Sequence, residues 1–220
     1  MNVDTRSRSR AGLLRWILIV TPGEVVGFVV PAIAGVAMSS APAGSAVIVT
    51  AGFIEGVVLG GAQYLAMRRS LPVLRPAVWV SLTGGAAVVA YVCGLLPSAL
   101  EPWWSTWPVP LQLVALAALI ITILGSIGGA QWVELRHHLQ GAAWWVVGTA
   151  IAWLVGLGIF FAIAPPLWHE GQPVATALMI GLLAAVGMAI AMAAVTGVTF
   201  GLLLSRNRVG ESAEPAVGAT

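Results

Sequence analysis

Six apolar runs, each long enough to cross a lipid bilayer, take up most of this sequence. A transmembrane helix needs about 20 consecutive, mostly apolar residues, and Pro, Gly and charged residues concentrate in the breaks between the runs, as turns require. Only 8% of the residues are charged, whereas soluble domains carry about 25%, so lipid must cover most of the surface. The expected spans are residues 14–38, 46–67, 77–99, 109–133, 142–164 and 174–204.

The arginines fix the expected orientation of these spans. All ten basic residues are Arg, and they lie before the first span or after the second, fourth and sixth. Basic loops stay in the cytoplasm, so both termini are expected there. The net charge of +2 does not indicate a nucleic-acid partner, because the arginines form short clusters that set membrane topology rather than one basic patch.

The strongest internal pattern is a repeat of about 68 residues. GGAQYLAMRR at 60–69 and GGAQWVELRH at 128–137 share Gly, Gly, Ala, Gln and Arg. The spans that surround them match as well, since WVSLT at 79–83 resembles WVVGT at 145–149. A unit of two spans repeats in parallel about an axis along the membrane normal. We therefore expect an all-α integral membrane protein whose six transmembrane helices form three tandem helical hairpins with approximate threefold pseudo-symmetry.

The repeat also sets the expected domain boundaries. The hairpins lie at about 14–70, 77–138 and 142–206. Together they form a transmembrane bundle over residues 14–205, preceded by a cytoplasmic N-terminal arm at 1–13 and followed by a small, polar, disordered cytoplasmic tail at 206–220. The Arg-rich start also resembles a signal peptide, but its apolar stretch is too long, so a retained first helix is expected.

Two kinds of repeated residue are expected to hold the helices together. In lipid, small residues mark the stripes where helices pack closely, and glycines recur at four-residue spacing near the end of each even span. A polar layer is expected near the inner membrane face, where Gln and Thr side chains bond neighbouring helices at about 0.6 kcal/mol per contact or line a polar pathway. The glycines are Gly52, Gly56, Gly60, Gly125, Gly129, Gly197 and Gly201, and the layer consists of Thr21, Gln63, Thr83, Gln131, Thr149 and Thr199.

These motifs carry a resemblance to a group of known sequences. W-V-x-x-T at the start of one span and G-x-x-Q-[W/Y]-x-x-x-R at the end of the next resemble uncharacterised bacterial multi-spanning membrane proteins built from repeated Gly-rich helical hairpins. The similarity extends over roughly residues 14–206. It implies a six-helix repeat bundle in a bacterial plasma membrane, and it brings no activity and no catalytic residue with it.

Two glutamates depart from the repeat. Glu24 and Glu55 lie near the middle of a hydrocarbon core about 30 Å thick, and the positions equivalent to Glu55 are Ile123 and Ala191, while those of Glu24 are Ala or similar. A carboxylate at such depth costs at least about 2.5–3.5 kcal/mol on insertion scales, and intramembrane acids commonly mark ion pathways. Pro22 removes a backbone donor beside Glu24, so a broken helix with an adjacent ion or substrate site is expected. The alternative is that either acid is neutral and serves packing alone.

No other residue pattern indicates a reaction. Cys93 is the only cysteine, so neither an intramolecular disulfide nor a cysteine metal site is expected. Glu134, His137 and His138 cluster at the expected inner interface and are interpreted as interface residues rather than as metal ligands. Sequence reasoning therefore predicts no catalytic residue, no metal and no cofactor.

Three functions follow from these patterns, in decreasing order of support. The first is a permease or channel-like protein for a proton, a cation or a small solute, with Glu24 and Glu55 as its charged site. The second is a membrane scaffold or partner subunit that binds another membrane protein through glycine stripes and Trp-rich loops. The third is an intramembrane enzyme.

Overall fold

In a computed structural model, which describes residues 3–38 and 44–212, all regular structure in the described chain is α-helical. Six of the helices are long and apolar enough to cross a membrane, so the predicted all-α membrane fold with six spans is confirmed. A seventh, short helix lies between the third and fourth spans. The helices are α1 (Val3–Met38), α2 (Gly44–Met67), α3 (Pro76–Ala99), α4 (Glu101–Trp104), α5 (Val109–Leu135), α6 (Ala143–Leu167) and α7 (Val174–Ser212).

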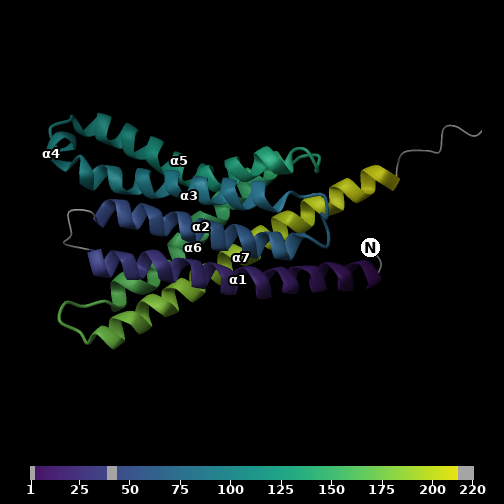
Figure 1. The fold of residues 1–220 in the computed structure, drawn as a ribbon, viewed down its shortest axis with the longest axis horizontal. Coiled ribbons are helices and arrows are strands. Elements are labelled where there is room, and N and C mark those ends of the chain that lie inside the picture. Colours follow the sequence, from purple (N-terminus) through teal and green to yellow (C-terminus); the bar gives the residue numbers. More distant parts are fainter. Residues whose placement is uncertain (1–2, 39–43, 213–220) are drawn as a thin grey trace, which may run out of the picture.

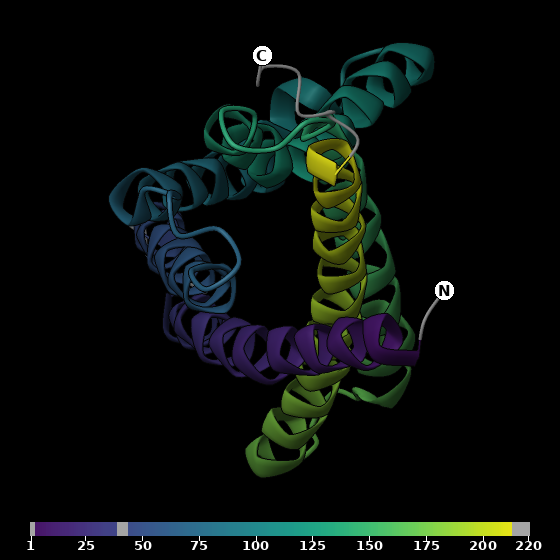
Figure 2. The ribbon, with the colours of Figure 1, turned by 90° about the vertical axis from the view of Figure 1, so that its right-hand side faces the viewer.

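The six long helices form a ring. Each packs against the next in chain order, and α1 also packs against α7, which closes the ring (Figure 2). Both α1 and α7 have their free ends at one end of the bundle, here called the terminal end, while α4 lies at the opposite end, here called the α4 end (Figure 1). An even number of spans places the two chain ends on one side of the membrane. The assignment of that side to the cytoplasm stays a prediction.

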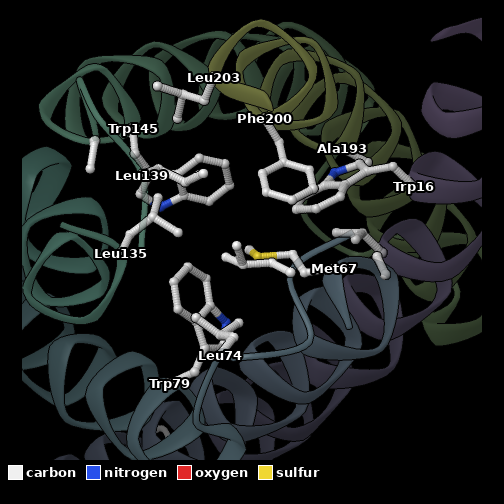
Figure 3. Close-up of a cluster of buried hydrophobic side chains, with 14 of the residues drawn as sticks. Trp16, Met67, Leu74, Trp79, Leu135, Leu139, Trp145, Ala193, Phe200 and Leu203 are labelled. Atoms are coloured by element: carbon white, nitrogen blue, oxygen red, sulfur yellow. The ribbon is translucent and has the colours of Figure 1, made fainter. Parts of the chain in front are cut away.

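Large apolar side chains fill the ring at the terminal end. Trp16, Trp79 and Trp145 come from α1, α3 and α6, and the centroids of the Trp16 and Trp79 rings each lie 6.0 Å from that of Trp145. Met67 and Leu135 end α2 and α5 and point into the same space (Figure 3). We call this cluster the central plug; its main members are Trp16, Met67, Trp79, Leu135, Trp145, Phe200 and Leu203. Met67, Leu135 and Leu203 are each 68 residues apart, which is the period of the predicted repeat, and they meet in this one cluster.

The glycine stripe predicted in α2 packs as expected, but the one in α5 has another register. A Cβ added to Gly56 would lie 2.8 Å from the Thr83 carbonyl oxygen of α3, so the two backbones approach closely there. In α5, nothing lies within 4 Å of such a Cβ at Gly125 or Gly129, whereas at Gly128 it would lie 2.9 Å from the Cα of Val146. The prediction for α5 was therefore wrong, because the helix turns its 128 face, not its 125/129 face, toward α6.

The ends of the bundle also differ from expectation. α1 begins at Val3 and α7 continues to Ser212, so residues 3–13 of the predicted arm and 206–212 of the predicted disordered tail are helical. The rest of that tail, 213–220, lies outside the described residues. The expectation of a helix break at Pro22 was wrong. α1 runs through this proline without interruption. Gly23 instead lies against Ala62, so its lack of a side chain allows α1 and α2 to pack closely.

Candidate functional site

The two predicted glutamates lie together inside the ring. Glu24 of α1 and Glu55 of α2 are only 7% and 8% exposed, and both line one small cavity with side chains of α1, α6 and α7. Because α2 and α6 are separated in the ring by α1 and α7, a cavity that touches both must lie in its interior. Its volume is about 10 Å³, close to the minimum that holds one water molecule. The other lining residues are Phe28, Trp153, Ala185, Met188 and Ala189.

The two carboxyl groups have different hydrogen-bond partners. Glu55 Oε2 accepts a hydrogen bond from the Tyr91 hydroxyl of α3, with an oxygen–oxygen distance of 2.6 Å. That length is typical of a bond from a hydroxyl to a carboxylate. Glu24 Oε2 is buried and has no partner in the described structure, although a buried polar group without a partner costs about 1–3 kcal/mol. The Glu24 oxygen is therefore available to a ligand.

Sequence reasoning missed Tyr91, although a signal was present. Tyr91 lies twelve residues after Trp79, and the residues twelve after Trp16 and Trp145 are Phe28 and Leu157. Tyr91 is thus a polar departure from the repeat, like the two glutamates. The same count shows that Trp153 holds the place of Glu24 in the third hairpin, eight residues after Trp145. The expectation of Ala or a similar residue is met at Ala87, eight residues after Trp79, and was wrong at Trp153.

Three members of the predicted polar layer form one hydrogen-bond network. Gln131 Nε2 donates to Gln63 Oε1 at 2.6 Å and to Thr83 Oγ1 at 2.9 Å. Gln131 Oε1 accepts from Trp145 Nε1 at 2.8 Å. This buried network connects α2, α3, α5 and α6, and the Gln131 amide uses both donor hydrogens within it. Such an arrangement fits interhelical bonding better than the wall of a solute pathway.

The other predicted members of the layer do not join this network. The Thr21 and Thr149 hydroxyls are buried and have no partner in the described part of the chain. Thr199 donates to the Val195 carbonyl oxygen of its own helix at 2.9 Å. On α7 the polar contact is made instead by Thr196, whose hydroxyl oxygen accepts a hydrogen bond from Trp16 Nε1 of α1 at 3.1 Å. Sequence reasoning missed Thr196 because the 68-residue shift points to Thr199, one turn away.

These groups follow one another along the bundle axis. On α2, Glu55 precedes Gln63 by eight residues and Gln63 precedes Met67 by four, or about 12 Å and 6 Å at 1.5 Å per residue. The carboxylate cavity is therefore separated from the terminal end first by the Gln131 network and then by the central plug.

The comparisons with known proteins assign no family to this chain. No family model, curated protein or solved structure matches it. The resemblance to uncharacterised bacterial multi-spanning proteins therefore stays a prediction, and the function has to be inferred from the residues of this chain.

A second buried charge lies at the terminal end. Glu134 of α5 has a fully buried side chain that pairs with Arg75, in the loop before α3, at 2.5 Å. The backbone N–H and Nε of Arg75 donate to the same carboxylate, and His138 Nε2 lies 3.1 Å from it. The hydrogen bonds from Arg75, together with the charge of Glu134, raise the pKa of the Arg75 guanidinium above its ordinary value.

This Arg75–Glu134 pair has a structural role, because it ties the loop between α2 and α3 to the end of α5. Its sequence signal was again a departure from the repeat, since the positions equivalent to Glu134 are Ala66 and Leu202. Within residues 3–38 and 44–212, no group of three or more His, Cys, Asp or Glu side chains is arranged to hold a metal ion.

Proposed function

We propose that this multi-pass membrane protein moves a proton, another cation or a small solute across the bilayer, and that Glu24 and Glu55 form its binding site. The observation that carries the proposal is a carboxyl oxygen of Glu24, which is buried inside the ring and has no partner among the described residues, while the Glu24 side chain lines a cavity. An ionisable group in a membrane span is costly, and such residues commonly mark substrate or ion pathways. The contact between Glu55 and Tyr91 adds a third polar group from a third helix.

The central plug is the proposed gate of this pathway. It closes the ring between the carboxylates and the terminal end with Trp, Met, Leu and Phe side chains, of which Trp79, Trp145 and Met67 are fully buried. Hydrophobic constrictions of this kind block ions because water does not wet them. Under this proposal the central plug closes the pathway, and passage requires the plug side chains to move apart.

The test is flux through liposomes that contain the purified protein. Gradients of protons, Na⁺, K⁺ and a small neutral solute are imposed in turn. We expect wild-type protein to dissipate at least one of them, and Glu24→Gln and Glu55→Gln to remove this flux while keeping the size-exclusion profile and helicity of the wild type. The matched control is Glu101→Gln, which makes the same change at an exposed residue of α4. Unchanged flux in both cavity variants contradicts the proposal.

The same proposal includes the location of the protein. We place it in a bacterial plasma membrane with the terminal end in the cytoplasm, supported by the position of all ten arginines near that end of the spans. Two single-cysteine variants test the orientation. In a protein whose native cysteine is removed by Cys93→Ser, a cysteine is introduced at Ser105 or at Ser205, which are both exposed. A membrane-impermeant maleimide should label Ser105→Cys in intact cells and Ser205→Cys only after permeabilisation; the reverse pattern contradicts the orientation.

We further propose that the three hairpins are related by an approximate threefold axis through the ring. The support is the central plug, in which Met67, Leu135 and Leu203 sit at matching sequence positions and Trp16, Trp79 and Trp145 do the same. An experimentally determined structure in which one-third turns superpose the hairpins would agree. Hairpins that superpose only after unrelated rotations would contradict this symmetry.

One observation favours the second function, a partner subunit. An open groove of about 540 Å³ runs between α3 and α5 and is lined largely by small residues, among them Ser81, Gly85, Gly125 and Ser126. In membranes, small residues of this kind mark helix–helix interfaces. A Gly85→Leu side chain would enter open space, because nothing lies within 4 Å of a Cβ there. Under this function, the substitution removes a co-purifying membrane protein and leaves any flux unchanged.

A further inference from the structure

We infer that the species bound at the cavity of Glu24 and Glu55 is a proton rather than a metal cation or a neutral solute; this inference rests on the proposed function. The cavity measures about 10 Å³, whereas sites for small organic molecules measure about 300–1,000 Å³. One water molecule is the largest occupant that fits. A solute would require the ring to open at this level.

The lining of the cavity also excludes a dehydrated metal ion. Channels bind K⁺ by replacing its water shell with rings of protein oxygens, and hard divalent cations need about six or more oxygen ligands. Among the described residues, only Glu24 and Glu55 bring side-chain oxygens to this cavity, and the backbone carbonyls of the helices around it are used in helical hydrogen bonds. The remaining lining side chains are those of Phe28, Trp153, Ala185, Met188 and Ala189, and none of them has an oxygen. A proton needs a single carboxyl oxygen and no shell.

The geometry provides the parts of a short proton relay. A proton that reaches the unpartnered oxygen of Glu24 converts that carboxylate to a neutral acid. The acid then gives its proton to a water molecule in the cavity, which passes one of its own to Glu55. Glu24 is again a carboxylate, Glu55 is the acid, and the water is unchanged, so atoms and charge balance. This exchange requires only the two carboxyl groups and the single water for which the cavity has room.

Tyr91 acts in this relay as a positioning residue. Its hydroxyl donates to Glu55 Oε2 at 2.6 Å, a bond that holds the side chain in one orientation and whose strength differs between a carboxylate and an acid. Within the part of the chain that the structure describes, no other titratable side chain lines the cavity, since its remaining lining residues are Phe28, Trp153, Ala185, Met188 and Ala189. Tyr91→Phe should therefore slow the relay and shift its pH profile, whereas a purely structural role would lower the flux equally at every pH.

The test compares proton flux with metal-ion flux in the same liposomes. A trapped pH-sensitive dye follows protons under an imposed pH gradient, with K⁺ and valinomycin holding the voltage at zero. Radioactive Na⁺ and Rb⁺ follow metal cations in separate aliquots without valinomycin, because valinomycin itself carries Rb⁺. We expect proton flux with wild-type protein and with Glu101→Gln, loss to the level of protein-free liposomes with Glu24→Gln and Glu55→Gln, and no metal flux above that level.

The other outcomes overturn either the proton assignment alone or the proposed function together with it. Flux of Na⁺, Rb⁺ or a neutral solute that depends on Glu24, without proton flux, overturns the proton assignment and leaves the proposed function standing. Absence of any flux that depends on Glu24 overturns both. If Glu24→Gln does not fold, dicyclohexylcarbodiimide, which reacts with protonated carboxyl groups in membranes, replaces it on wild-type protein. Proton flux that falls in step with Glu24 modification supports the relay, and undiminished flux at full modification overturns it.

Discussion

Gly56→Ala tests whether close backbone packing holds α2 against α3. A Cβ at this position would lie 2.7 Å from the Ala87 Cβ, 2.8 Å from the Thr83 carbonyl oxygen and 2.9 Å from the Gly84 Cα. Two of these three atoms belong to the backbone, so a change of rotamer cannot relieve the contact. Carbon atoms pack best at about 3.5–4.0 Å, so the two helices would have to separate by about 1 Å.

The expected cost follows from a comparison with Gly61→Ala on the same helix, where a Cβ meets nothing within 4 Å. Both substitutions gain the same benefit of about 0.5–1 kcal/mol from replacing a helical glycine, so this gain cancels in the difference. What remains is the overpacking at Gly56, about 1–3 kcal/mol. We therefore expect Gly56→Ala to unfold more easily than Gly61→Ala by that free energy.

Unfolding in mixed micelles by titration with sodium dodecyl sulfate, followed by the fluorescence of the ten tryptophans, measures this difference. The midpoint for Gly61→Ala should equal or exceed that of the wild type, and the midpoint for Gly56→Ala should lie below both. Equal stabilities for the two variants would refute the reasoning, because they would show that the contact between α2 and α3 relaxes without cost.

The same titration tests two further contacts. Trp145→Phe removes the indole donor to Gln131 Oε1 and leaves a buried acceptor unpaired, so we expect the free energy of unfolding to fall by about 1–3 kcal/mol. The control is Trp79→Phe, because the Trp79 indole N–H has no partner in the described structure, and it should lower the stability less. Equal losses for the two variants would show that the hydrogen bond is not the cause. Arg75→Ala should destabilise the protein by about 1.5–3 kcal/mol, the value of hydrogen bonds to a charged group, because it leaves the buried Glu134 carboxylate without its cation. Glu134→Gln should cost less, since Arg75 is 62% exposed and keeps its hydration, and the opposite order would contradict this account.

The sequence predicted best those features that depend on position along a helix. Hydropathy fixed the six spans because a bilayer selects for length and apolarity, and the repeat placed Gln63 and Gln131 at one level, where they bond each other. It could not predict the rotation of each helix about its own axis. That rotation decides that Gly128, rather than Gly125 or Gly129, meets α6. A change of one helical turn or less in sequence position leaves a residue at nearly the same level along the bundle axis but changes the helix that it faces.

Contacts between a loop and a helix were beyond sequence reasoning for another reason. Arg75 and Glu134 lie 59 residues apart, in segments whose distance is set by the closure of the whole ring. Read separately, Arg75 is a topology signal and Glu134 an interface residue, and nothing in either neighbourhood predicts the pair. Ala66 and Leu202 stand at the positions equivalent to Glu134 in the predicted repeat. This difference marks Glu134 as a departure from the repeat, but it does not predict which residue Glu134 contacts.

Departures from the repeat nevertheless have a physical meaning in the middle of this bundle. The positions equivalent to Glu55 hold Ile123 and Ala191, so a helix of this ring packs at that level without a carboxylate. The acid and its cost of at least about 2.5–3.5 kcal/mol are therefore not required by the fold. Glu24 and Glu55 line one cavity, and Tyr91, a third such departure, bonds Glu55. Three polar groups that depart from the predicted repeat are thus brought together, as the proposed relay site in the membrane interior would need.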